Sequence, residues 1–468
     1  MSDERKNTAE DKQRSLSELL TQKPGALLWQ YCLPAVVGMV VMSLYNIVDR
    51  IFIGQVVGAN AIAGLAITFP VMNLSAAIGV LIGVGASART SILLGERNVQ
   101  RATKVLGNAL VLTLANATAY ITLFAIFIDD ILRAFGASDV TLPYAHDFMV
   151  WILPGMLMMN LAFSFNSIMR ASGYPGRAMV TMLIGAGLNI VLAPIFIYFL
   201  DLGIKGAAIA TDISMTISML FVMAHFVSSR SHVHFTRGTY GLEKNIVWDI
   251  ISIGAAPSII NAASCFINVI LNHSLYRYGG DTAIAVAGIF TTYTSFIVTF
   301  MLGICQGMQP IIGYNYGAGR PDRVRRTFYI VVAWCTAISV IGWLGGQFVP
   351  DYIAMAFTVD LDLIESVNRY LPLSLTCFFV VGLQVVATTF FQSIGQAGRS
   401  MFMSLSRQVI FLIPLLLILP HFFEIEGVWA SFAVSDIIAT VVAFVLLYYP
   451  PSPLRTDCRP RLEPDETY

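Results

Sequence analysis

The chain alternates between long apolar stretches and short polar segments. Each apolar stretch has about 20 residues, which is the length that an α-helix needs to cross the hydrocarbon core of a bilayer. The pattern predicts an all-α polytopic membrane protein with twelve transmembrane helices. The expected spans are residues 29–53, 61–85, 105–128, 143–168, 178–200, 205–227, 249–275, 284–310, 327–348, 367–392, 401–420 and 427–449.

The composition of the 468 residues agrees with this class. Hydrophobic residues make up 56% of the chain and charged residues only 12%, and the mean hydropathy is +0.72. Soluble domains carry about 25% charged residues, so the composition excludes a soluble globular protein. The formal net charge is zero, and we expect membrane lipid as the surrounding partner and no nucleic acid.

Basic residues gather in every second loop. If the N-terminus is cytoplasmic, the inner segments hold 23 lysines and arginines, whereas the outer loops hold three, Arg133, Lys205 and Arg277. Because basic residues favour the cytoplasmic side, we expect both termini there and a multi-pass protein of the plasma (inner) membrane. The first 28 residues lack the apolar core of a signal peptide, and we interpret residues 15–20 (SLSELL) as an amphipathic segment at the inner leaflet.

The second half of the chain repeats the first with a shift near 222 residues. The clearest match is NSIMRASGYPGRAM at 166–179 against TTFFQSIGQAGRSM at 388–401, and GERNVQR at 95–101 is echoed by GAGRPDR at 317–323. Six crossings return the chain to its starting side, so the two copies are parallel repeats related by a pseudo-twofold axis. The expected parts are a cytoplasmic segment (1–28), two six-helix bundles (29–227 and 249–449), a cytoplasmic linker (228–248) and a cytoplasmic tail (450–468).

Asp49 is an unusual residue for the first predicted span. An ionised carboxylate within a membrane helix costs about 2.5 to 3.5 kcal/mol, so a retained one indicates an ion or substrate site. Met42, Tyr45 and Asn46 share its helix face by three-and-four spacing, and we expect this face to line a substrate cavity. The alternative is a polar pair of Asp49 with Arg50 at the helix end.

The second bundle has polar stripes and almost no acid. Asn261, Ser264, Asn268 and Asn272 follow one helix face, and Gln384, Thr388 and Gln392 follow another. Such faces must meet protein or water. One interpretation is hydrogen bonding between helices. The other is a wet substrate cavity that includes Asn268, Asn272, Gln384 and Thr388.

Two further features concern conformation. Pro34 leaves one carbonyl of its helix unbonded and permits a kink, which either bends during transport or is fixed. Arg407 and Asp436 lie at comparable depths on the last two helices. They are expected to form a structural ion pair between adjacent helices, with a proton or substrate relay as the alternative.

The order and spacing of several segments resemble the multidrug and toxic compound extrusion (MATE) family, bacterial type. These segments are Pro34 with VDRIFIG (48–54), GANAIAGLAITFP (58–70), RASGYPGRAM (170–179), NIVLAP (189–194), GIKGAAIAT (203–211) and FQSIGQAGRSM (391–401). The resemblance implies a V-shaped pair of six-helix bundles that works by alternating access. It implies export of small amphipathic, often cationic compounds in exchange for Na⁺ or H⁺, without another cofactor. We expect a monomer.

The resemblance also implies a cation site in the first bundle. Asp49, Asn189 and Thr211 match the family's ligands, with Na⁺ as the metal that Asp49 would bind. Ala193 stands where the family often has a second acid. Asp212 lies at about the same depth as Asn189 and Asp49, so we hypothesise that it supplies or modulates the missing charge. Otherwise it is a structural hydrogen-bonding group.

Other functions fit less well. The sequence has no HExxH, GxSxG or GxxxxGK[ST] motif, which disfavours a membrane enzyme and ATP-driven export. A channel does not readily explain a twofold repeat with one asymmetric acid. The remaining alternative is a flippase for lipid-linked oligosaccharides, which should need basic residues in its cavity to bind phosphates, and the predicted helices contain few.

Overall fold

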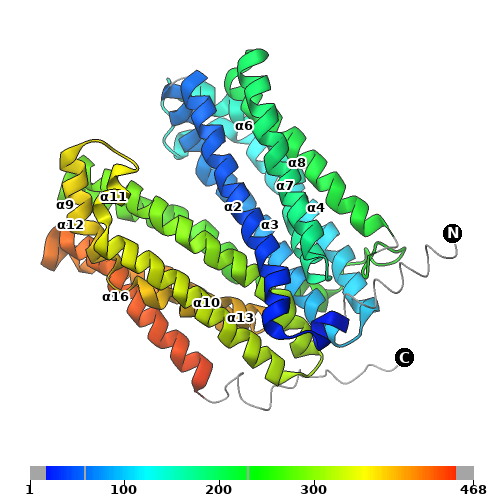
Figure 1. The fold of residues 1–468 in the computed structure, drawn as a ribbon. Helices are drawn as coiled ribbons and strands as arrows, with labels where there is room; N and C mark the ends of the chain where they lie inside the picture. The colour runs from blue at the N-terminus through cyan, green and yellow to red at the C-terminus, as the bar shows by residue number, and fades with distance from the viewer. Residues whose placement is uncertain (1–16, 57–58, 229–230, 450–468) are drawn as a thin grey trace.

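The computed structural model describes residues 17–56, 59–228 and 231–449, and the side chains of residues 46–63 and of Cys265 lie outside the description. The described residues form helices and contain no strand. The helices make two groups that meet at one end of the molecule and diverge toward the other (Figure 1). Helix α2 begins and α16 ends at the end where the groups meet, which we call the closed end.

The first half of the chain contains six long helices and one short one. They are α2 (Pro24–Val56), α3 (Ala59–Gly95), α4 (Val99–Ile126), α5 (Ile128–Ala134), α6 (Leu142–Ala171), α7 (Pro175–Pro194), which continues as the π-helix η1 (Ile195–Phe199), and α8 (Gly203–Val227). Helices α2, α3, α4, α6, α7 and α8 are each long and apolar enough to cross a membrane.

The second half is built from a longer run of broken helices. They are α9 (Lys244–Gly317), α10 (Pro321–Phe348), α11 (Pro350–Met355), α12 (Leu361–Leu375), η2 (Phe378–Val380), α13 (Val381–Ser393), α14 (Ala397–Leu405), η3 (Ser406–Leu412), α15 (Ile413–Ile418) and α16 (Pro420–Tyr448). The 74-residue α9 is two helices that meet at Gly280, where φ is +65°, a conformation that glycine adopts without strain. Helices α12 and α13 form one span bent by 44°.

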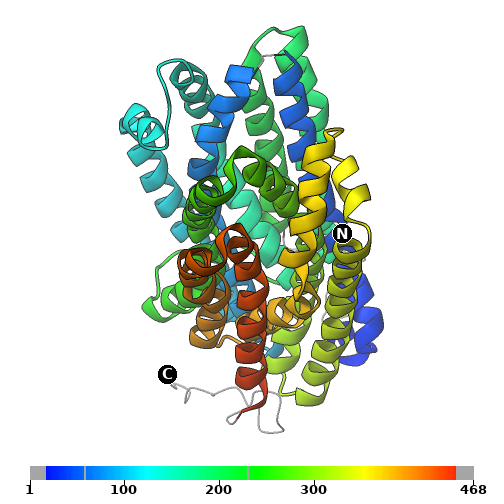
Figure 2. The ribbon, with the colours of Figure 1, turned by 90° about the vertical axis from the view of Figure 1, so that its left-hand side faces the viewer.

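With α9 counted as two helices, the described residues contain the twelve predicted spans in two repeated halves. Several helices begin earlier than the apolar pattern predicts, such as α4 at Val99 and α10 at Pro321. Their first turns carry charged residues that a hydropathy pattern excludes, although the backbone is already helical. Figure 2 shows, from the side, the helices of both halves running along the length of the molecule.

Glycines allow the two halves to pack closely at the closed end. A β-carbon on Gly95 of α3 would overlap the carbonyl oxygen of Tyr314 in α9, and one on Gly317 would overlap the carbonyl oxygen of Ile92 in α3. Gly95 and Gly317 are 222 residues apart, so the repeat places the same contact on both sides of the interface. We call these two reciprocal contacts the glycine seam.

The segment before α2 also packs inside the protein at the closed end. Leu19 is fully buried, and its carbonyl oxygen accepts hydrogen bonds from Asn315 Nδ2 at 3.2 Å and from Arg323 Nη2 at 3.1 Å. The interpretation of residues 15–20 as a segment at the lipid surface is therefore wrong for Leu19. The apolar side of this short amphipathic piece contacts protein because the second half offers it polar and apolar partners.

Candidate functional site

Two of the predicted coupling residues lie in contact. Asn189 of α7 is 1% exposed, and its Nδ2 donates a 2.9 Å hydrogen bond to Thr211 Oγ1 of α8. The Thr211 hydroxyl in turn donates to the carbonyl of Ala207 at 3.0 Å. These bonds do not use Asn189 Oδ1, so the pair presents an amide oxygen and a hydroxyl oxygen, which are ligands suited to hard cations.

The surroundings of this pair are apolar. Ala193, one turn after Asn189, is 1% exposed and packs in a cluster with Ile197, Ile204 and Ala207. No acid takes its place there. Asp49 and Asn46 belong to α2, but their side chains lie outside the described residues, so their contacts remain a prediction.

The other residues predicted for the first cavity pack against one another. Tyr45 is 9% exposed and forms a small cluster with Ala186 of α7 and Met215 of α8. Met42, Met158 and Met159 pack around this cluster. In this structure the predicted face of α2 is therefore covered by α6, α7 and α8. Pro34 lies inside α2 without ending it.

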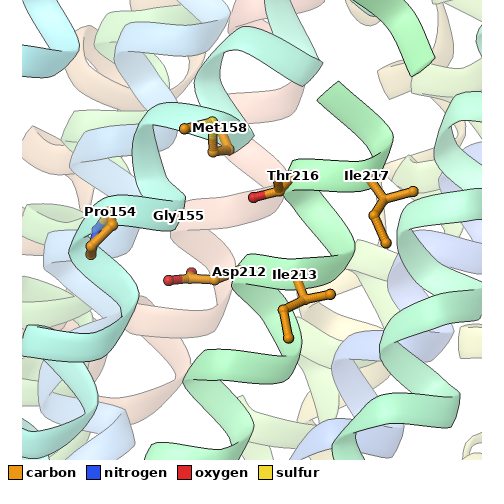
Figure 3. A pocket seen from close by; sticks show the side chains of 7 residues that line it. All are labelled: Pro154, Gly155, Met158, Asp212, Ile213, Thr216 and Ile217. Atoms are coloured by element: carbon orange, nitrogen blue, oxygen red, sulfur yellow. The ribbon is translucent and has the colours of Figure 1, made fainter. Parts of the chain in front are cut away.

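Asp212 points in a different direction from Thr211. It faces the turn of α6 at Pro154 and Gly155, and with Met158 and Thr216 it lines a pocket of about 300 Å³ between α6 and α8 (Figure 3). Asp212 Oδ1 is buried and has no hydrogen-bond partner. A β-carbon on Gly155 would overlap this oxygen. Asp212 and Thr216 are four residues apart on one helix face, a spacing that sequence reasoning did not use.

The polar stripes of the second half divide into two kinds. Gln384 is buried and its Nε2 donates to the carbonyl of Met403 at 3.3 Å, which is a contact between helices. Thr388 Oγ1 bonds to the backbone of its own helix at Gln384. Asn268 and Asn272 are exposed, so they are the two stripe residues open to an incoming ligand.

The structure brings Arg407 and Asp436 together. Arg407 Nε lies 2.8 Å from Asp436 Oδ1, and the carbonyl of Arg407 accepts a 2.6 Å hydrogen bond from Ser435 Oγ. The Asp436 side chain is 7% exposed and that of Arg407 is 22% exposed. The pair joins η3 to α16 at a π-helical segment, which the apolar pattern did not predict.

Sequence reasoning also missed the glycine seam. Its signal was present, because Gly95 and Gly317 are the first residues of the matching segments GERNVQR and GAGRPDR. Within the described part of the chain, no group of three or more His, Cys, Asp or Glu side chains is arranged to hold a metal ion.

Comparisons with known proteins match this architecture. The MatE family model matches residues 34–195 and again residues 257–418, once in each half. Multidrug export protein MepA of Staphylococcus aureus (strain MSSA476) is 27% identical over 421 residues, which cover 90% of this chain and 93% of MepA. The relative is a transporter and covers both halves.

Solved structures give the same result. The MATE multidrug transporter DinF-BH, solved as a complex, has a TM-score of 0.85 and 34% identity. An outward-facing conformation of a multidrug resistance MATE family transporter of the MOP superfamily has a TM-score of 0.86 and 25% identity. Each match covers 92% of this chain and 96% of the other. The chain belongs to the MatE family and is a multi-pass MATE multidrug efflux transporter of the bacterial type.

Proposed function

We propose that this transporter exports small amphipathic, often cationic compounds in exchange for Na⁺ or H⁺, and that the first half couples the two movements. The observation that carries the proposal is the buried hydrogen bond between Asn189 and Thr211. It joins α7 and α8, and α2, which carries Asp49, packs against α7. Two of the three expected ligands thus already meet where the third helix is in contact.

The proposed coupling follows from the cost of a bare carboxylate. In an apolar bundle Asp49 is stable with a proton or a cation bound. Na⁺ would be held by the Asp49 carboxylate, Asn189 Oδ1 and Thr211 Oγ1, and a cationic substrate would displace it. Because the ligands belong to three helices, binding and release change how α2 packs, and Pro34 permits α2 to bend.

The proposed coupling gives Asp212 no direct contact with the Asn189 pair. Thr211 and Asp212 are adjacent on α8, so their side chains point about 100° apart. Asp212 faces α6, and any effect on the coupling ion would act only through space. In the second half, Asn268 and Asn272 with Gln384 and Thr388 are proposed to form a nearly neutral wall of the substrate path.

We infer that the closed end faces the cytoplasm of a cell with the transporter in its plasma (inner) membrane. The support is the excess of lysine and arginine in the segments at that end. Both termini would then be cytoplasmic, with residues 1–28, the linker 228–248 and the tail 450–468 on that side. The bundles 29–227 and 249–449 would open outward, and the transporter would act as a monomer.

Transport into everted membrane vesicles tests this proposal. Ethidium uptake is measured with an imposed Na⁺ gradient, an imposed proton gradient, or neither, and vesicles without the protein serve as the control. We expect uptake that one of the two gradients drives and that a second amphipathic cation inhibits. Uptake independent of both gradients would contradict ion-coupled export. Movement of a lipid-linked oligosaccharide in the same vesicles, without ethidium uptake, would instead support the flippase that the multidrug relatives do not favour.

A further inference from the structure

Asp212 is a carboxylate without a counter-ion. Its Oδ1 is buried and accepts no hydrogen bond, and none of the residues that line the pocket is a lysine, arginine or histidine. The described ion pair nearest along the sequence, between Lys205 and Asp147 at 3.2 Å, is formed by other side chains. A charge without a partner is costly inside a membrane protein, so its retention indicates a ligand.

The facing turn of α6 increases the negative character of this pocket. Pro154 lies inside α6 and has no amide hydrogen, so the carbonyl of Val150 loses its helical donor. Gly155 has no side chain, and this allows the Asp212 carboxylate to lie directly against the α6 backbone. Figure 3 shows Asp212 and Thr216 directed from α8 toward this turn. The pocket therefore presents oxygen atoms only on one side.

The rest of the pocket and its rim are apolar. Met158, Ile213 and Ile217 line it, and Ile217 is 40% exposed. Trp151 on α6 is 47% exposed and Leu220 on α8 is 57% exposed. Helix α8 lies on the side of the first half that is away from the second half (Figure 1). In a membrane protein, exposed apolar side chains on that side contact lipid.

From this geometry we propose that the pocket between α6 and α8 binds the positively charged head group of an amphipathic organic cation that arrives through the bilayer. Asp212 is the counter-ion, Thr216 and the α6 carbonyl contact the head group, and the apolar tail lies along Ile213 and Ile217. The inference rests on the proposed function for the class of substrate. It adds a lipid-facing site separate from Asn189 and Thr211.

The chemistry of the pocket favours an organic cation over a metal ion. A hard metal ion requires about six oxygen ligands, whereas the lining residues offer one carboxylate and one hydroxyl among apolar side chains. The volume of about 300 Å³ is at the lower limit of small-molecule sites, which suits a head group rather than a whole drug. Methionine, here Met158, adapts to ligands of different shape.

The test measures binding of two amphiphiles of nearly equal shape to the purified full-length protein in nanodiscs of a zwitterionic lipid. Decyltrimethylammonium carries a positive charge, and decyldimethylamine N-oxide is neutral overall at pH 8. We expect the wild type to prefer the cation, and Asp212→Asn to reduce that preference by about tenfold while binding of the N-oxide stays unchanged. Gly155→Ala should act in the same direction, because its β-carbon displaces the carboxylate.

Asp201→Asn is the matched control, because Asp201 is an exposed acid just before α8, and this variant should keep the preference. An unchanged preference in Asp212→Asn would overturn the proposal, as would an equal loss of binding for both amphiphiles. Gradient-driven ethidium transport in the same preparations reports separately on the proposed antiport. Wild-type binding with that preference but without transport would contradict the antiport and leave the site supported.

Discussion

Asn189 of α7 donates a 2.9 Å hydrogen bond to Thr211 of α8, and both side chains are buried. Thr211→Val removes the acceptor and keeps the shape, so Asn189 Nδ2 loses its partner. We expect the free energy of unfolding to fall by about 1 to 3 kcal/mol, as measured by thermal unfolding in detergent. We also expect transport to require a higher concentration of the coupling ion, because one oxygen ligand is lost.

Thr113→Val is the control for that variant. Thr113 is a buried threonine of α4 whose hydroxyl bonds to the carbonyl of Ala109 in its own helix. It should lower stability less than Thr211→Val and leave the ion dependence unchanged. If both variants shift the ion dependence equally, the Asn189 pair has no special part in coupling.

The glycine seam should control which end of the transporter is open. Alanine at Gly95 or Gly317 would overlap a carbonyl oxygen of the opposite half, and overpacking of this kind costs about 1 to 3 kcal/mol. We expect either variant to shift the population toward opening at the closed end, measured by spin-label distances between the two halves. Gly187→Ala, at a helix position with open space around it, should leave the distances unchanged. Identical distances in all variants would show that the seam does not select the conformation.

The ion pair of Arg407 and Asp436 can be separated from a relay by an apolar replacement. Gly206 and Gly427 pack in the same way on the preceding helix, and this match places Met215 at the position of Asp436. The repeat places Gly185 at that of Arg407. In the first half, the terminal carbon of Met215 is 3.8 Å from a β-carbon built at Gly185, so this interface packs without charge.

We therefore expect Asp436→Asn, which leaves Arg407 unpaired, to lower the free energy of unfolding by about 3 to 5 kcal/mol. The double variant Arg407→Leu with Asp436→Met should restore most of that stability and still transport. Chemical denaturation and vesicle transport measure the two effects. A double variant that is stable but does not transport would favour the relay over the structural role.

Glu96 provides a pH-dependent test at the closed end. It follows α3 directly, and burial raises the pKa of its carboxyl above the ordinary value of 4.5, with Arg89 and Arg101 opposing the shift. The folded protein thus binds this proton more tightly than the unfolded chain, and stability decreases as pH rises from the ordinary pKa through the raised one.

Glu96→Gln removes this titration. The variant should have a higher Tm than the wild type above that pH window and a similar Tm below it, measured from about pH 4 to pH 8. A difference that is constant across the range would mean that the charge of Glu96 is not responsible.

The sequence predicted what depends on periodicity and repetition. Twelve apolar spans, the parallel repeat and the meeting of Asn189 with Thr211 all follow from helix spacing, and so do the different directions of Thr211 and Asp212. The burial of Leu19 could not be predicted, because an amphipathic piece has the same pattern whether lipid or protein covers it. The packing of Tyr45 against Met215 depends on the conformation of the transporter, which a single sequence does not specify.

Asp49 is proposed to exchange the coupling ion for cargo, and ion flux in proteoliposomes tests this exchange most directly. Ethidium is added on one side, and the release of protons or of labelled Na⁺ is recorded for the wild type, Asp49→Asn and the control Asp201→Asn. We predict ethidium-dependent ion release by the wild type and the control, and release at least about tenfold slower by Asp49→Asn. Ion release at the wild-type rate by Asp49→Asn would contradict the proposed exchange.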